Sequence, residues 1–215
     1  GPICVAEHLV PFLPGHSIFG STQNQVSAAP FGSAGILPIT YGYIRMMGTE
    51  GLTQATKIAI LNANYLAACL KDTYGIVYRG ATGFVGHEMI LECRKVHEET
   101  GISENDIAKR LMDYGYHAPT LSFPVHGTLM IEPTESESLA ELDNFVDVML
   151  NIWKEIQEVK NEEADKNDNV LINAPHPEYE IVNDNWEHSY TREKAAYPIE
   201  SVRENKFWVN VARVD

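Results

Sequence analysis

Residues 128–159 read TLMIEPTESESLAELDNFVDVMLNIWKEIQEV, and this stretch decides the fold class. Its first four residues form a short apolar run that predicts a strand ending at the Glu-Pro pair of residues 132–133. Apolar residues then recur at steps of one, three and four over 139–159, which predicts an amphipathic helix. Thr134 and Ser138 each precede a glutamate by three residues, so either can cap that helix. A strand followed by a long amphipathic helix indicates a domain that contains both.

The polar positions of this region are mostly acidic. Residues 132–168 carry 12 Asp and Glu against 3 Lys and Arg, within a chain whose net charge is −14. We expect the charged side chains of the helix to take its outer, solvated face rather than to dock a basic partner; these are Glu141, Asp147, Lys154, Glu155 and Glu158. The acidity argues against nucleic acid and against an anionic membrane surface as partners.

The residues before this stretch predict the rest of a small sheet. Two strands are expected at 76–79 and 87–94, joined by a glycine-rich turn. A helix begins after Ser103, which forms a capping box with Asp106, and it stops at Gly115. The order strand, strand, helix, strand, helix predicts an α/β fold of the α+β kind, in which helices cover one face of a small mixed or antiparallel sheet.

The first fifty residues do not look like an autonomous domain. A helix is predicted over 39–47, stopped by Gly48, and a second over 53–73. The second helix has few charges and apolar residues on several faces, so we expect it to be buried on most sides, in part by partners outside the chain. The predicted organisation is a connecting segment at 1–50, an α/β domain at 51–170 and an irregular C-terminal extension at 171–215 packed on that domain.

Most short motifs indicate ordinary structure. The spacing of Gly80, Gly83 and Gly86 is not the dinucleotide fingerprint, and the His87-Glu88 pair lacks the second histidine of a zinc protease. No G-x-S-x-G elbow occurs, and we predict no metal site. The three cysteines are odd in number and widely spaced, which indicates free thiols in a reducing compartment. No apolar run reaches the roughly 18–20 residues of a membrane span.

Two segments are rich in functional side chains. Residues 114–127, YGYHAPTLSFPVHG, place rings, hydroxyls and prolines between a helix and a strand. Residues 174–177 and 192–198 form the second group. Rigid loops of this kind often carry function, but a plain crossover loop explains them equally well.

The sequences of several motifs resemble those of one family. These motifs are GPI at 1–3, PFLPGH at 11–16, VSAAPFGSA at 26–34, YIRMMG at 43–48, APTLSFPV at 118–125, GTLMIEPTESE at 127–137, APHP at 174–177, AAYP at 195–198, KFW at 206–208 and RVD at 213–215. In this order they resemble the C-terminal portion of glycine dehydrogenase (decarboxylating), the P-protein of the glycine cleavage system. Two places depart from the family pattern: Val209-Asn210 replaces the usual proline, and His126 stands where a small residue or proline is common.

The resemblance implies a fold and a cofactor. The chain would be the C-terminal small domain of a fold-type I pyridoxal-phosphate enzyme, with residues 1–50 leading from the large cofactor domain. The Schiff-base lysine would lie upstream of Gly1, so pyridoxal phosphate would not be bound covalently by these residues and the fragment would be inactive alone.

The resemblance also implies a reaction and partners. The enzyme would decarboxylate glycine oxidatively and pass the aminomethyl group to the lipoyl arm of the H-protein. The residues expected to contact the substrate channel are Tyr116, His117 and Thr120, with Arg192 as an anion contact. The intact enzyme would be a homodimer or heterotetramer, cytoplasmic in a bacterium and mitochondrial in a eukaryote. The alternative is a non-catalytic module that binds a lipoyl carrier or another protein.

Overall fold

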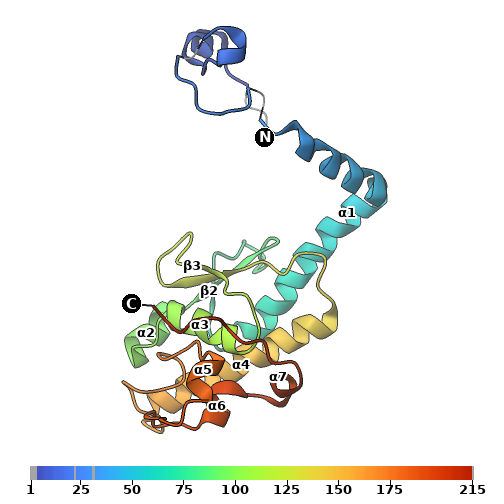
Figure 1. Ribbon diagram of the computed structural model, residues 1–215. Helices are drawn as coiled ribbons and strands as arrows, with labels where there is room; N and C mark the ends of the chain where they lie inside the picture. Colours follow the sequence, from blue (N-terminus) through green and yellow to red (C-terminus); the bar gives the residue numbers. More distant parts are fainter. Residues whose placement is uncertain (1–3, 22, 31, 215) are drawn as a thin grey trace. The chain divides into compact units, whose positions relative to one another are not determined.

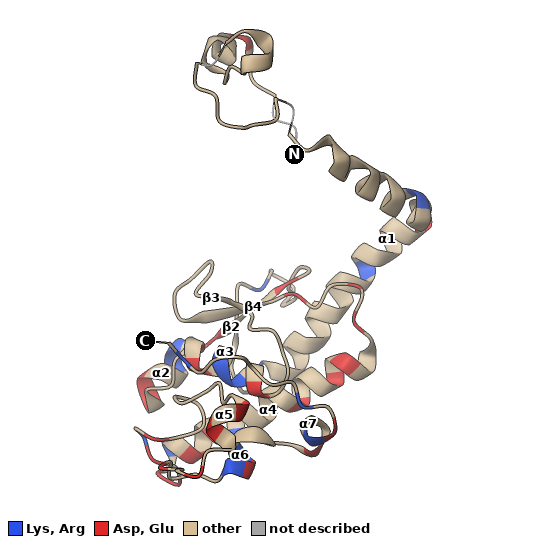
Figure 2. Cartoon of the chain, viewed as in Figure 1, with Lys and Arg blue, Asp and Glu red and all other residues tan. Residues whose placement is uncertain are grey.

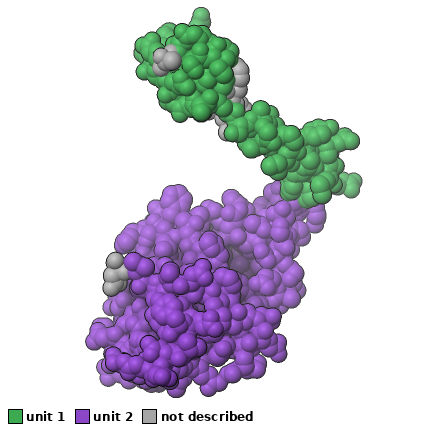
Figure 3. Space-filling view, in the orientation of Figure 1, with its two compact units in different colours: residues 1–52 green, residues 53–215 purple. Residues whose placement is uncertain are grey.

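The computed structural model describes residues 4–21, 23–30 and 32–214 (Figure 1). The matched motif at 1–3, and single positions of the motifs at 26–34 and 213–215, lie outside the described residues. The chain divides into two compact units, residues 1–52 and residues 53–215 (Figure 3). No helix in the described ranges is long and apolar enough to cross a membrane.

Residues 1–52 hold little regular structure before their last helix. Short 3-10 helices span Glu7–Phe12, Ser17–Phe19 and Ala34–Ile36. His16 closes a loop, because its Nδ1 accepts from the backbone N–H of Ile18 and its Nε2 lies 2.9 Å from the carbonyl oxygen of Ala28. Large apolar side chains in this unit are exposed, and charges are scarce (Figure 2). The role of connecting segment stays a prediction.

Helix α1, Leu37–Leu70, contains an interruption at Gly48, whose φ of 62° and ψ of −177° are not helical. The predicted stop at Gly48 is therefore confirmed as a kink, because glycine adopts this positive φ at little cost. This chain alone buries part of the second helix, and the expected burial of its other faces by partners outside the chain stays a prediction. Only one stripe of it is buried, and Leu61 on another face is 61% exposed.

The sheet has four strands, all antiparallel, in the order β1-β2-β4-β3. Strand β1 is Ile76–Val77, β2 is Met89–Glu92, β3 is Thr120–Leu121 and β4 is Thr128–Ile131. The antiparallel sheet and the bounds of β4 are confirmed. Strand β3 was not predicted, since its two residues lie inside the proline-rich segment.

Three helices cover this sheet. Helix α2, Arg94–Thr100, was not predicted, and its first residue lies in the strand expected at 87–94. Helix α3, Glu104–Asp113, has the predicted capping box between Ser103 and Asp106. Helix α4, Leu139–Lys160, is capped by Ser138, whose side chain accepts from the backbone N–H of Glu141. Helices α2 and α3 each pack on α4, α3 also contacts β3 and β4, and all three lie on one side of the sheet in Figure 1, as predicted.

The C-terminal residues form short helices, α5 at Glu178–Ile181, α6 at Arg192–Ala196 and α7 at Glu200–Glu204. They are tied to the body by Arg110, which is fully buried. Its guanidinium donates to Glu155, to Asp113 and to the backbone carbonyls of residues 194 and 195. Asp113 in turn contacts the buried His176 at 2.7 Å. The APHP motif at 174–177, which contains His176, thus has a structural role. Glu155 is only 6% exposed, so the expectation that it lies on the outer face of its helix is wrong.

Candidate functional site

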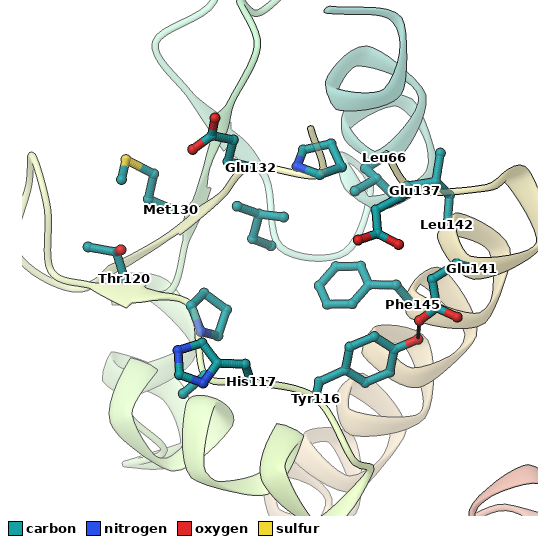
Figure 4. Close-up of a pocket in the computed structure, with 14 residues that line it drawn as sticks. Leu66, Tyr116, His117, Thr120, Met130, Glu132, Glu137, Glu141, Leu142 and Phe145 are labelled. Atoms are coloured by element: carbon teal, nitrogen blue, oxygen red, sulfur yellow. Dashed lines mark hydrogen bonds between the residues drawn. The ribbon is translucent and has the colours of Figure 1, made fainter. Parts of the chain in front are cut away.

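A pocket of about 450 Å³ opens where the 116–120 loop meets helix α4 (Figure 4). The loop connects α3 to β3, and the opposite wall comes from the end of β4 and the first turns of α4. Leu66 of helix α1 closes one side. The pocket is lined by Leu66, Tyr116, His117, Ala118, Pro119, Thr120, Met130, Ile131, Glu132, Pro133, Glu137, Glu141, Leu142 and Phe145. Three of the four residues expected to contact substrate therefore come together.

Tyr116 is part of the pocket wall. Its hydroxyl donates to Glu141 Oε1 at 2.8 Å and accepts from Asn144 Nδ2 at 2.7 Å. Its ring packs edge to face on Phe145, with centroids 5.2 Å apart. Burial and the hydrogen bond to the Glu141 carboxylate raise the pKa of Tyr116 well above its ordinary value. The hydroxyl thus stays neutral and hydrogen-bonded, and it cannot serve as a base near neutral pH.

His117 and Thr120 differ from Tyr116, because both are exposed on the pocket side of the loop. In the ranges that the structure describes, neither side chain has a hydrogen-bond partner. An imidazole and a hydroxyl without partners can donate to or accept from a ligand without breaking a bond of the fold. They are the polar groups of this loop that a ligand can reach.

The facing wall is acidic. Glu132, Glu137 and Glu141 line the pocket, and no Lys or Arg is among the described residues of its lining. Across the described part of the chain, none of these three carboxylates forms an ion pair. Figure 4 shows the Glu137 carboxylate beside the ring of Phe145, pointing into the pocket. The field in this pocket therefore favours the ammonium end of a ligand over a carboxylate or phosphate.

Arg192 does not belong to this pocket. It begins helix α6, and its Nη2 donates to the carbonyl oxygens of Asn183 at 2.6 Å and Asp184 at 3.2 Å. Its guanidinium also lies 5.3 Å from the centre of the Trp186 ring. These contacts hold the loop before α6, and its role as an anion contact stays a prediction.

The acidic half of the pocket was not predicted from the sequence. Glu141 was expected on the solvated face of α4, yet it is half-buried and accepts the Tyr116 hydroxyl. Phe145 was assigned to the core stripe, whereas it lines the pocket while remaining packed on the core. The available signal was the position of Glu137 just before the N-cap of α4, and of Glu141 in its first turn, in a helix that follows a sheet strand. Among the described residues, no three His, Cys, Asp or Glu side chains gather to hold a metal ion.

Comparison with known proteins gives the family. The matching family is described as "Glycine dehydrogenase, C-terminal domain", and its model covers residues 55–176. The chain belongs to this family. The antiparallel sheet and helices described above are thus the fold of a glycine dehydrogenase C-terminal domain, and the matched range includes every residue that lines the pocket.

Three similar curated proteins are bacterial and carry the same name. A protein of Bacteroides fragilis named glycine dehydrogenase (decarboxylating) is 90% identical over all 215 residues. Proteins of the same name from Serratia proteamaculans and Proteus mirabilis are 60% and 57% identical across the whole chain. The chain spans 23% of the length of each of these relatives.

Proposed function

We propose that this chain is the C-terminal domain of a glycine dehydrogenase (decarboxylating) of the glycine cleavage system. The observation that carries the proposal is the 90% identity, over the whole chain, to a protein of that name. In this proposal the domain contributes one wall of the glycine site. His117 and Thr120 supply exposed polar groups, and Tyr116, fixed by Glu141 and Asn144, keeps the wall rigid.

The charges of the pocket limit which part of the reaction it can serve. Glycine carries an ammonium and a carboxylate, and the lining offers carboxylates but no cation to the second. We therefore assign the ammonium side of bound glycine to this wall. The group that neutralises the carboxylate must come from another part of the longer protein, because an unpaired carboxylate beside Glu137 would be repelled.

The lining also does not fit pyridoxal phosphate, the cofactor that the family implies. Within the described part of the chain, no lysine lines the pocket to attach it, and no Lys or Arg of the lining can pair with its phosphate. We therefore propose that the cofactor and its lysine belong to the rest of the longer enzyme. That enzyme would pass the aminomethyl group to a lipoyl H-protein, act as a homodimer or heterotetramer, and work in the bacterial cytoplasm.

The test replaces the matching 23% of the Bacteroides fragilis glycine dehydrogenase with these 215 residues. We expect the chimera to release CO₂ from glycine with a kcat/KM within about twofold of the parent enzyme, and the 215-residue chain alone to release none. A chimera that has the parent's oligomeric state and thermal stability but no activity would contradict the proposal. That result, with binding of a lipoyl carrier by the isolated chain, would favour the non-catalytic binding module.

A further inference from the structure

The turn between β3 and β4 is tied to the first turn of helix α3 through one serine. Ser122 Oγ donates to Glu104 Oε1 at 2.5 Å and accepts from the backbone N–H of Gly127 at 3.2 Å. His126 Nδ1 lies 3.3 Å from the same oxygen. A hydroxyl has one donor and two acceptor positions, so these three contacts use its full capacity when His126 donates.

The backbone of Ser122 does not explain why a serine stands there. Its φ is 50°, in the left-handed region where glycine has no steric penalty and other residues do. What serine adds over glycine at this position is the hydroxyl. Because its acceptor is a carboxylate, the bond to Glu104 is the stronger, charge-assisted kind.

This contact matters because the backbone ladder that holds β3 is short. The strand is two residues long and exposed, and it pairs with β4 on one side only. The next backbone bond, from Ser122 N–H to the carbonyl oxygen of Thr128 at 2.8 Å, ends the ladder. So short a ladder is marginal by itself. Thr120 is two residues before Ser122, so the position of its side chain depends on what fixes the end of the strand.

We propose that Ser122 and Glu104 are positioning residues that hold the His117–Thr120 wall of the pocket. Neither residue lines the pocket, so both act through the loop rather than on a ligand. Glu104 is the first residue of α3, whose start is fixed by the Ser103–Asp106 capping box. Asp106 also pairs with Arg213, so this turn is anchored on two sides. The position of the wall is thereby fixed relative to the first turn of α3.

The clamp itself is tested on the 215-residue chain by amide hydrogen exchange at Ser122. Ser122→Gly keeps the backbone geometry and removes the hydroxyl, while Glu104→Ala removes the acceptor without touching the turn. We expect both to speed exchange of this amide by about tenfold. Glu104→Gln keeps an oxygen acceptor and should stay within about threefold of the unsubstituted chain, as should the control Glu98→Ala on helix α2. Unchanged exchange in Ser122→Gly and Glu104→Ala would overturn the clamp.

The effect on the site is tested in the chimera described above, and this part rests on the proposed function. We expect Ser122→Gly and Glu104→Ala to raise KM for glycine by about fivefold with kcat within about twofold, and Glu104→Gln to restore KM. An unchanged KM together with faster exchange would overturn the positioning role. If the chimera with the unsubstituted chain is inactive, the proposed function fails, and the exchange data still decide whether the clamp exists.

Discussion

The buried position of Arg110 leads to a large and specific stability prediction for Arg110→Met. The guanidinium is fully buried and donates to two carboxylates, Glu155 and Asp113, of which Asp113 is 1% exposed. Methionine fills a similar volume but leaves both carboxylates without their cation. Breaking a buried ion pair in this way costs about 3–5 kcal/mol, much of it from the charges left unpaired.

The assay is urea-induced unfolding of the 215-residue chain, followed by circular dichroism at neutral pH. The matched control is Arg203→Met, because Arg203 is 45% exposed and pairs with exposed glutamates. The control should change the free energy of unfolding by less than about 0.5 kcal/mol. Arg110→Lys keeps a charge but loses the planar fork, so its loss should lie between the two. A loss below about 1 kcal/mol for Arg110→Met would refute the reasoning that this network holds the C-terminal residues.

Three further predictions concern single side chains. Tyr116→Phe removes the hydroxyl that joins Glu141 and Asn144, so unfolding of the chain should become easier by about 1 kcal/mol in the same urea assay. Arg192→Ala should leave kcat/KM for glycine in the chimera within about twofold, because Arg192 lies outside the pocket; a tenfold loss would restore it as a substrate contact. Despite a partial desolvation that acts in the opposite direction, hydrogen bonds from Ser189, His188 and Asn173 lower the pKa of Asp168 to about 2. Its contribution to stability is therefore present above about pH 4, the unfolded value, and is lost as the pH falls through about 2. Carbon NMR titration should find that pKa, and Asp168→Asn should flatten the fall in stability over this range.

Local signals in the sequence were enough for most of the fold. The capping box at Ser103, the N-cap at Ser138 and the apolar run of β4 depend on neighbours within four residues, and the structure shows each of them. Strand β3 is different, since its two residues become a strand only by pairing with β4. Helix α2 was missed because it begins two residues after the end of β2. The apolar pattern of the strand therefore continued up to the start of the helix, and the change from strand to helix periodicity was not recognised.

The candidate site was also predicted only in the part that depends on neighbours in the sequence. Tyr116, His117 and Thr120 lie within five residues on one loop, so their meeting follows from proximity in the chain. The glutamates of the facing wall come from α4, and periodicity alone assigned Glu141 to solvent. Periodicity reports which face of a helix is apolar, but not what lies across from the polar face. Arg192 and the 116–120 loop are separated by more than seventy residues, so no local pattern in the sequence shows whether the two meet.

The most direct test of the central claim compares two exposed histidines in the chimera. His117 lines the pocket without a partner in the described part of the chain, and His97 lies on helix α2, outside the pocket. The measurement is kcat/KM for release of labelled CO₂ from glycine. We predict that His117→Ala lowers it by about tenfold or more, and that His97→Ala leaves it within about twofold. Equal activities for the two variants would contradict the claim that this pocket forms a wall of the glycine site.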